Sequence, residues 1–131
     1  QTALTAALAE LWDREKRLIR IYTPPFLPEE RAPGYVSTYG PGFRENGGQY
    51  THAAVWLALA LHRAGRREEA AALAEDMALS LTAPEYGAEP FVLPADIAYA
   101  PGKEGRAGWS WYTGAAGWYL RLLRELYGTE P

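Results

Sequence analysis

The sequence has 131 residues, of which 48% are hydrophobic, so it suits one globular unit or a part of a larger one and excludes a disordered chain. A formal net charge of -3 excludes the broad basic surface that sequence-independent nucleic-acid binding needs. The sequence contains no apolar run of the roughly 18 to 20 residues that cross a bilayer, no signal-peptide pattern, and no cysteine for disulfides or thiolate metal sites.

The lack of cysteine fits a reducing compartment, and we expect a cytoplasmic location with no membrane contact by this segment. A membrane anchor elsewhere in a parent protein stays compatible with that expectation. The first residue is Gln1 and the sole methionine is Met77, so we expect the chain to be an excerpt or a processed product.

The N-terminal part is predicted to contain one helix, a short strand and a long loop. Apolar residues recur at helical spacing across Thr2–Asp13, and Leu18–Tyr22 is a short run with strand propensity. From Thr23 to Gly48 prolines and glycines are too frequent for a regular element. Loops of this length in compact domains are usually functional or disordered. The aromatic residues of this one favour an ordered loop.

Three more helices are predicted in the C-terminal part. Tyr50–Ala64 is apolar nearly all round, which is typical of a helix buried in a larger helical assembly, and Gly65 is a favourable stop. Arg67–Leu81 follows at once, so the two helices are expected to form an αα-hairpin. The last helix is predicted over Thr113–Tyr127.

A second long loop, Thr82–Trp109, separates the last two helices, and a short strand is predicted within it at Phe91–Leu93. The fold class predicted from the whole pattern is all-α, with about four helices and two long ordered loops. We expect residues 1–131 to form a single unit, because no internal repeat or second domain is visible.

Two helix starts share a chemistry. The segments ENGGQYTH and WYTGAAGW place small or polar residues at a helix N-terminus, where unpaired backbone N–H groups and the helix dipole favour an anion. His52 lies in the first turn after one segment, while Thr113 offers a hydroxyl and Gly114 admits an oxyanion close to the backbone in the other. Two plainer interpretations stay open, namely Thr113 as a simple N-cap and His52 as a structural histidine.

Loop residues offer two kinds of sugar chemistry. The chain has five tryptophans and nine tyrosines, and rings on loops stack on sugars, although core packing is the alternative. Glycoside hydrolysis usually uses two carboxylates, and Glu45 with Asp96 is one candidate pair. Loop acids also commonly face solvent or bind backbone N–H groups. His52 and His62 have no carboxylate at zinc-site spacing, so no metal site is predicted.

Three separated blocks resemble the C-terminal part of glycoside hydrolase family 94: PGYVSTYGPGFRENGGQYTHAAVW, EPFVLPADIAYAP and GRAGWSWYTGAAGW. The similarity is to the phosphorylase-like region of cyclic β-1,2-glucan synthases and to β-glycan phosphorylases, and it extends from about Leu18 to Leu126. The resemblance implies part of an (α/α)6 barrel. It also implies an inverting enzyme that cleaves a β-glucosidic bond with inorganic phosphate as co-substrate and with no other cofactor.

The resemblance further implies roles for single residues. The phosphate site of the family falls on His52, Thr113 and Gly114. Candidate sugar-binding residues are Arg44, Glu45, Gln49 and Glu89. The general acid of the family and a phosphate-binding arginine lie upstream of the matching blocks, so no catalytic residue is assigned here, and we expect the isolated chain to be inactive.

The predicted function is therefore that of the C-terminal portion of a glycoside phosphorylase or glucan synthase domain, which contributes phosphate and sugar contacts. The expected partners are a β-glucan or β-glucoside substrate and either the rest of the barrel or further copies of the chain. The alternative is a non-catalytic helical module that binds carbohydrate or serves as a scaffold.

Overall fold

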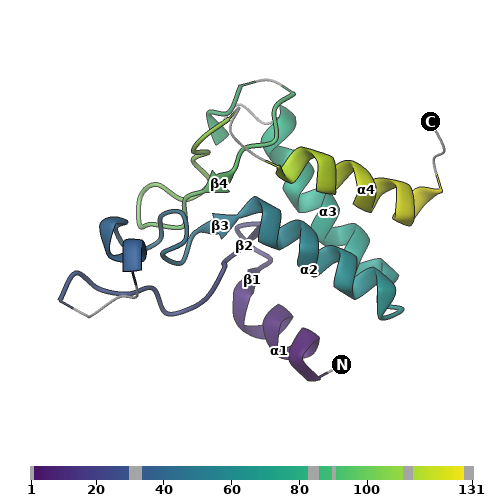
Figure 1. The fold of residues 1–131 in the computed structure, drawn as a ribbon, viewed down its shortest axis with the longest axis horizontal. Helices are drawn as coiled ribbons and strands as arrows, with labels where there is room; N and C mark the ends of the chain where they lie inside the picture. The colour runs from purple at the N-terminus through teal and green to yellow at the C-terminus, as the bar shows by residue number, and fades with distance from the viewer. Residues whose placement is uncertain (1, 30–33, 83–85, 90, 111–113, 129–131) are drawn as a thin grey trace.

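The computed structural model describes residues 2–29, 34–82, 86–89, 91–110 and 114–128 (Figure 1). Its α-helices are α1 (Thr2–Leu11), α2 (Thr51–Arg63), α3 (Arg67–Thr82) and α4 (Ala115–Tyr127). Its short strands are β1 (Trp12–Asp13), β2 (Leu18–Ile19), β3 (Gln49–Tyr50) and β4 (Asp96–Ile97), and one 3-10 helix, η1, covers Gly34–Thr38. Helix is the main regular structure, as predicted, whereas the partial (α/α)6 barrel stays a prediction.

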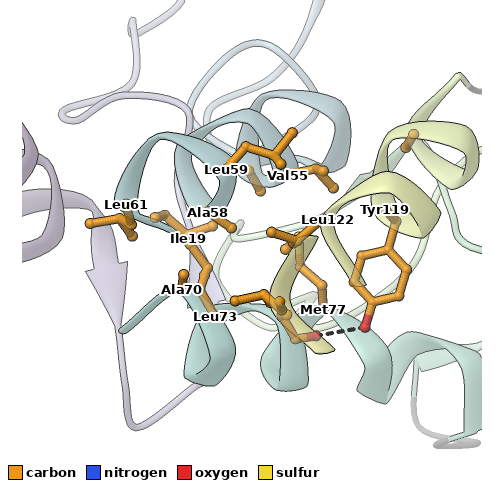
Figure 2. Packing of buried hydrophobic residues seen from close by; sticks show 14 of the residues in the cluster. Ile19, Val55, Ala58, Leu59, Leu61, Ala70, Leu73, Met77, Tyr119 and Leu122 are labelled. Atoms are coloured by element: carbon orange, nitrogen blue, oxygen red, sulfur yellow. Dashed lines mark hydrogen bonds between the residues drawn. The ribbon is translucent and has the colours of Figure 1, made fainter. Parts of the chain in front are cut away.

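Helices α2, α3 and α4 pack around one hydrophobic core (Figure 2). Val55, Leu73 and Leu122, one from each helix, are almost completely buried, and apolar burial of this kind is the main stabilising contribution to folding. Tyr119 of α4 joins the core, and its hydroxyl donates a 2.9 Å hydrogen bond to the carbonyl of Ala74 in α3. Burial raises the pKa of Tyr119 to about 12, so the hydroxyl keeps its proton and can donate it.

Helices α2 and α4 lie side by side with their N-termini at the same end (Figure 1). At that end the ring centres of His52 and Trp118 are 6.0 Å apart. At the other end Arg63 Nη2 lies 2.7 Å from Glu125 Oε1. Helix α3 runs in the opposite direction after the tight turn at Gly65, so both long loops lead back to the N-terminal ends of α2 and α4.

Two short antiparallel strand pairs fasten the loops. Strand β1 pairs with β2, and β3 pairs with β4, which places Tyr50 opposite Asp96. The Thr51 N–H donates a 2.9 Å hydrogen bond to the carbonyl of Ala95. Because β3 leads directly into α2, the second pair holds the chain around Asp96 against the start of α2.

The observed elements confirm the four predicted helices and the short strand after Arg17, with small differences at their ends. The strand predicted at Phe91–Leu93 is wrong. Phe91 is a turn residue with a φ of 64° and is 87% exposed, and the strand forms instead at Asp96–Ile97, where Gln49–Tyr50 provides a pairing partner. None of the helices in the described ranges is long and apolar enough to cross a membrane.

Candidate functional site at two helix starts

The first turn of α2 presents His52 to the first turn of α4. The His52 ring lies 4.8 Å from that of Trp56 and 6.0 Å from that of Trp118, and the two tryptophan rings are 5.4 Å apart. Nε2 of His52 is buried and has no hydrogen-bond partner among the described residues. Buried polar atoms in folded proteins are normally paired. This nitrogen is therefore placed to be stabilised by a bound group that supplies a partner.

The start of α4 combines an exposed N-cap residue with a buried first residue, Ala115. Its N-cap residue is Gly114, which is exposed, and a Cβ built there would meet no heavy atom within 4 Å. In the described part of the chain, neither N-cap residue, Tyr50 for α2 or Gly114 for α4, bonds its helix start through a side chain. Unpaired N–H groups at helix starts attract anions. The structure thus brings His52 and the α4 start together, while Thr113 lies outside the described residues and its hydroxyl contact stays a prediction.

Asn46 organises the turn that precedes α2. The residue is 2% exposed, and its Oδ1 accepts hydrogen bonds from the Tyr22 hydroxyl (2.9 Å) and the Phe26 N–H (2.8 Å). Its Nδ2 donates to the carbonyls of Phe26 (3.0 Å) and Tyr39 (2.8 Å), so the full capacity of the amide is used. Gly47 follows with a φ of 84°, and a Cβ there would lie 2.8 Å from a neighbouring proline side chain, so only glycine fits.

Arg44, Glu45 and Asp96 form a charged cluster beside this turn. Arg44 Nε lies 3.7 Å from Glu45 Oε2 and 3.9 Å from Asp96 Oδ1. The guanidinium carbon lies 5.1 Å from the Tyr39 ring centre and 4.5 Å from that of Trp109, so the cation is within reach of two aromatic rings. Burial raises the pKa of Asp96, although the charge of Arg44 acts in the opposite direction. Glu45 and Asp96, the candidate pair of carboxylates from the sequence, therefore both face Arg44.

The two remaining candidate sugar-binding residues have different surroundings. Gln49 is 2% exposed, and its Oε1 accepts a 3.0 Å hydrogen bond from the Ile19 N–H, so it braces β2 against β3. Glu89 is exposed on the loop after α3. Their predicted roles in sugar binding stay predictions.

Sequence reasoning did not single out Tyr39 or Trp109. A local signal existed for Trp109, which stands beside a glycine in a loop and is 54% exposed. Tyr39 carries the same local signal, because Gly40 follows it, but its relation to Arg44 depends on the folded turn. Within the described ranges, no group of three or more histidine and acidic residues gathers in a way that could hold a metal ion.

The chain belongs to the glycosyl hydrolase 94 superfamily, because the model of the catalytic domain of that superfamily matches residues 2–127. This confirms the resemblance seen in the three sequence blocks and places the chain in carbohydrate metabolism. The chain is also 48% identical over 125 residues to cyclic beta-(1,2)-glucan synthase NdvB of Rhizobium meliloti (strain 1021). The aligned part is 91% of this chain but 4% of that relative, so the chain spans only a small part of the relative's length.

Proposed function

We propose that this chain forms part of a catalytic domain that acts on β-glucosidic bonds of a β-glucan with inorganic phosphate and inverts the anomeric centre. Two findings support the proposal, namely membership of the superfamily and similarity to a protein named as a cyclic beta-(1,2)-glucan synthase. No cofactor besides the phosphate co-substrate is required by this chemistry.

In the proposed reaction, a phosphate oxygen attacks the anomeric carbon as the bond to the leaving glycosidic oxygen breaks. A carboxylic acid protonates that oxygen, and the products are glucose 1-phosphate and a shortened glycan. Because phosphate replaces the water that the second carboxylate activates in an inverting hydrolase, one acid is enough. We propose that this acid lies in a segment upstream of this chain, so this chain contributes contacts to phosphate and sugar.

The observation that carries the proposal is the meeting of two helix starts at His52. Its unpaired Nε2 is buried beside Trp118 of α4, and the exposed Gly114 opens the start of that helix. An anion between the two starts would receive a hydrogen bond from the imidazole and would be favoured by both helix dipoles. Thr113 completes the proposed phosphate site.

Arg44 and Glu45 are proposed as sugar contacts beside the turn at Asn46. Their side chains are 22% and 17% exposed, so they are partly reachable, and Trp109 offers an exposed ring beside them. Charged side chains next to an exposed aromatic ring suit a ligand with hydroxyl groups on an apolar ring face.

The test uses the 131-residue chain and its two histidines. Both lie in α2, and each has one buried ring nitrogen without a partner among the described residues, Nε2 in His52 and Nδ1 in His62. Millimolar phosphate, added stepwise at constant ionic strength, should shift the NMR signals of the His52 ring and of Gly114 saturably and leave those of His62 in place. His52→Ala should abolish the Gly114 shift, and His62→Ala should preserve it.

Equal shifts at both histidines would indicate general anion attraction and would contradict the proposed site. Absence of any shift at His52 in the folded chain would contradict it as well. A saturable response to a β-glucan with none to phosphate would favour the carbohydrate-binding module instead.

A further inference from the structure

The carboxylate of Asp96 is the most deeply buried acidic group that the proposed function leaves without a role. Its side chain is 6% exposed, and it opens β4, directly opposite Tyr50. The backbone pairing of this segment with the next one fixes its position, because the Gly108 N–H donates a 2.8 Å hydrogen bond to the Asp96 carbonyl. The side chain is confined too, since a Cβ at Gly108 would lie 2.4 Å from both carboxylate oxygens.

An oxygen of this carboxylate and one of Glu45 both lie within 4 Å of Arg44 Nε. Arg44 Nε, Glu45 Oε2 and Asp96 Oδ1 are all buried, and none has a hydrogen-bond partner among the described residues. The separations of 3.7 Å and 3.9 Å from Nε exceed a direct hydrogen bond. Leaving buried charged groups unpaired is costly. The set comprises one cationic donor and two anionic acceptors at ion-pair distance, so the charge of Arg44 is the partner of both carboxylates.

The arginine in this cluster is held in an unusual position. Arg44 has a φ of 46°, in the left-handed region that non-glycine residues rarely adopt. Its guanidinium lies close to the rings of Tyr39 and Trp109. Strained backbone of this kind persists where the surroundings fix it and is common at functional sites. Contact with two rings favours the position of the cation, but it does not determine which edge of the guanidinium faces inward.

We infer that Asp96 is a positioning residue, whose buried carboxylate, together with that of Glu45, holds the Nε edge of Arg44 inward by charge attraction. With Nε committed in this way, recognition of a ligand falls to the two Nη groups of the guanidinium. That last step rests on the proposed function, because it makes the oriented Nη groups the contact for a sugar hydroxyl. The positioning itself does not depend on any ligand.

The test reads Arg44 directly in the isotopically labelled 131-residue chain. The NMR signal of its Nε–H is identified by its loss in Arg44→Lys, and exchange of this hydrogen with solvent should be slow. Asp96→Asn should speed the exchange about tenfold or more, since the buried negative charge that holds Nε inward is removed. The matched control is Glu104→Gln, which neutralises an acid of the same loop that pairs with Lys16 instead. It should leave the Arg44 signal unchanged.

A pH titration gives a readout that a merely structural role would not move. Burial raises the pKa of Asp96, so the Arg44 Nε–H signal should change together with the Asp96 carboxyl carbon, at a pH above the usual aspartate range. The other titratable groups nearby are Glu45 and the tyrosines Tyr35, Tyr39 and Tyr50. Glu45 is followed through its own carboxyl carbon, and tyrosines ordinarily titrate near pH 10, far above this range. The step should vanish in Asp96→Asn.

Unchanged exchange of the Arg44 Nε–H in Asp96→Asn with helix content intact would overturn the inference. If Asp96→Asn does not fold, the wild-type titration decides, because protonation of Asp96 without a change at Arg44 would refute it and a joint change would support it. None of these measurements contains phosphate or glucan. A failure here is therefore separate from a failure of the proposed function.

Discussion

Asn46→Asp should destabilise the chain strongly, because it replaces an amide that donates two hydrogen bonds with a group that at neutral pH donates none. The carbonyls of Phe26 and Tyr39 would lose their donor and face a carboxylate oxygen instead. A buried polar group left unpaired costs about 1–3 kcal/mol, so two such groups predict a loss of about 2–6 kcal/mol in the free energy of unfolding. This is a large share of the roughly 5–15 kcal/mol of a typical domain.

The assay is urea unfolding followed by tryptophan fluorescence, with the slope of the transition compared between variants. Gln49→Glu is the matched control, since Gln49 is also 2% exposed. Its side-chain oxygen accepts a hydrogen bond from the Ile19 N–H, and glutamate retains that acceptor. Asn46→Asp should lose clearly more stability than this control. Its loss should shrink at about pH 3, because a protonated aspartate regains one donor and the folded state favours that neutral form. A midpoint equal to that of the wild type at about pH 7 would refute the reasoning.

Two further predictions concern activity and pH. The isolated chain should release no glucose 1-phosphate from β-glucan and phosphate. Protonation of the leaving group is worth about 10²- to 10⁴-fold in rate, and its donor is proposed to lie upstream. Clear release would instead indicate that Glu45 or Asp96 is the acid. Hydrogen bonding from Arg63, aided by Arg121, lowers the pKa of Glu125 to about 2 from its ordinary 4.5. The resulting stability is present above about pH 4.5 and is lost as the pH falls toward about 2. Because Arg63 is 55% exposed, Glu125→Gln should lower the free energy of unfolding by less than about 1 kcal/mol at neutral pH. If the difference in unfolding free energy between this variant and the wild type stays constant as the pH falls toward about 2, the lowered pKa of Glu125 is contradicted.

The helices were predictable because their signal is local. The apolar residues of Tyr50–Ala64 and the glycine that follows them suffice to predict a helix and its end, and α2 is observed at Thr51–Arg63. The tight connection to α3 likewise follows from Gly65 and the few residues beside it. Each of these elements depends on residues within a few positions of one another, which a single sequence displays directly.

The geometry of the site was less predictable because it depends on contacts between distant residues. Helix-start chemistry indicated His52 and Gly114, but the contact of His52 with Trp118 in the first turn of α4 comes from the packing of α2 against α4. The burial of Asp96 depends on Gly108 and on pairing with β3, which no local pattern encodes. The error at Phe91–Leu93 has the same origin, since an apolar run predicts a strand but only a pairing partner makes one.

The hydrogen bonds of Asn46 also affect how the protein is chemically modified during storage. Asparagine followed by glycine is especially prone to deamidation, because the next backbone nitrogen attacks the side-chain carbonyl carbon and glycine leaves that approach unhindered. In the folded chain four hydrogen bonds fix this amide away from the attack, so the native state protects it. Each time the chain unfolds, that protection is lost. The aspartate that then forms has no N–H to donate to the carbonyls of Phe26 and Tyr39. In stored preparations, the molecules that have unfolded should therefore lose the ability to refold, before any deamidation of Asn46 is detected in the molecules that stay folded.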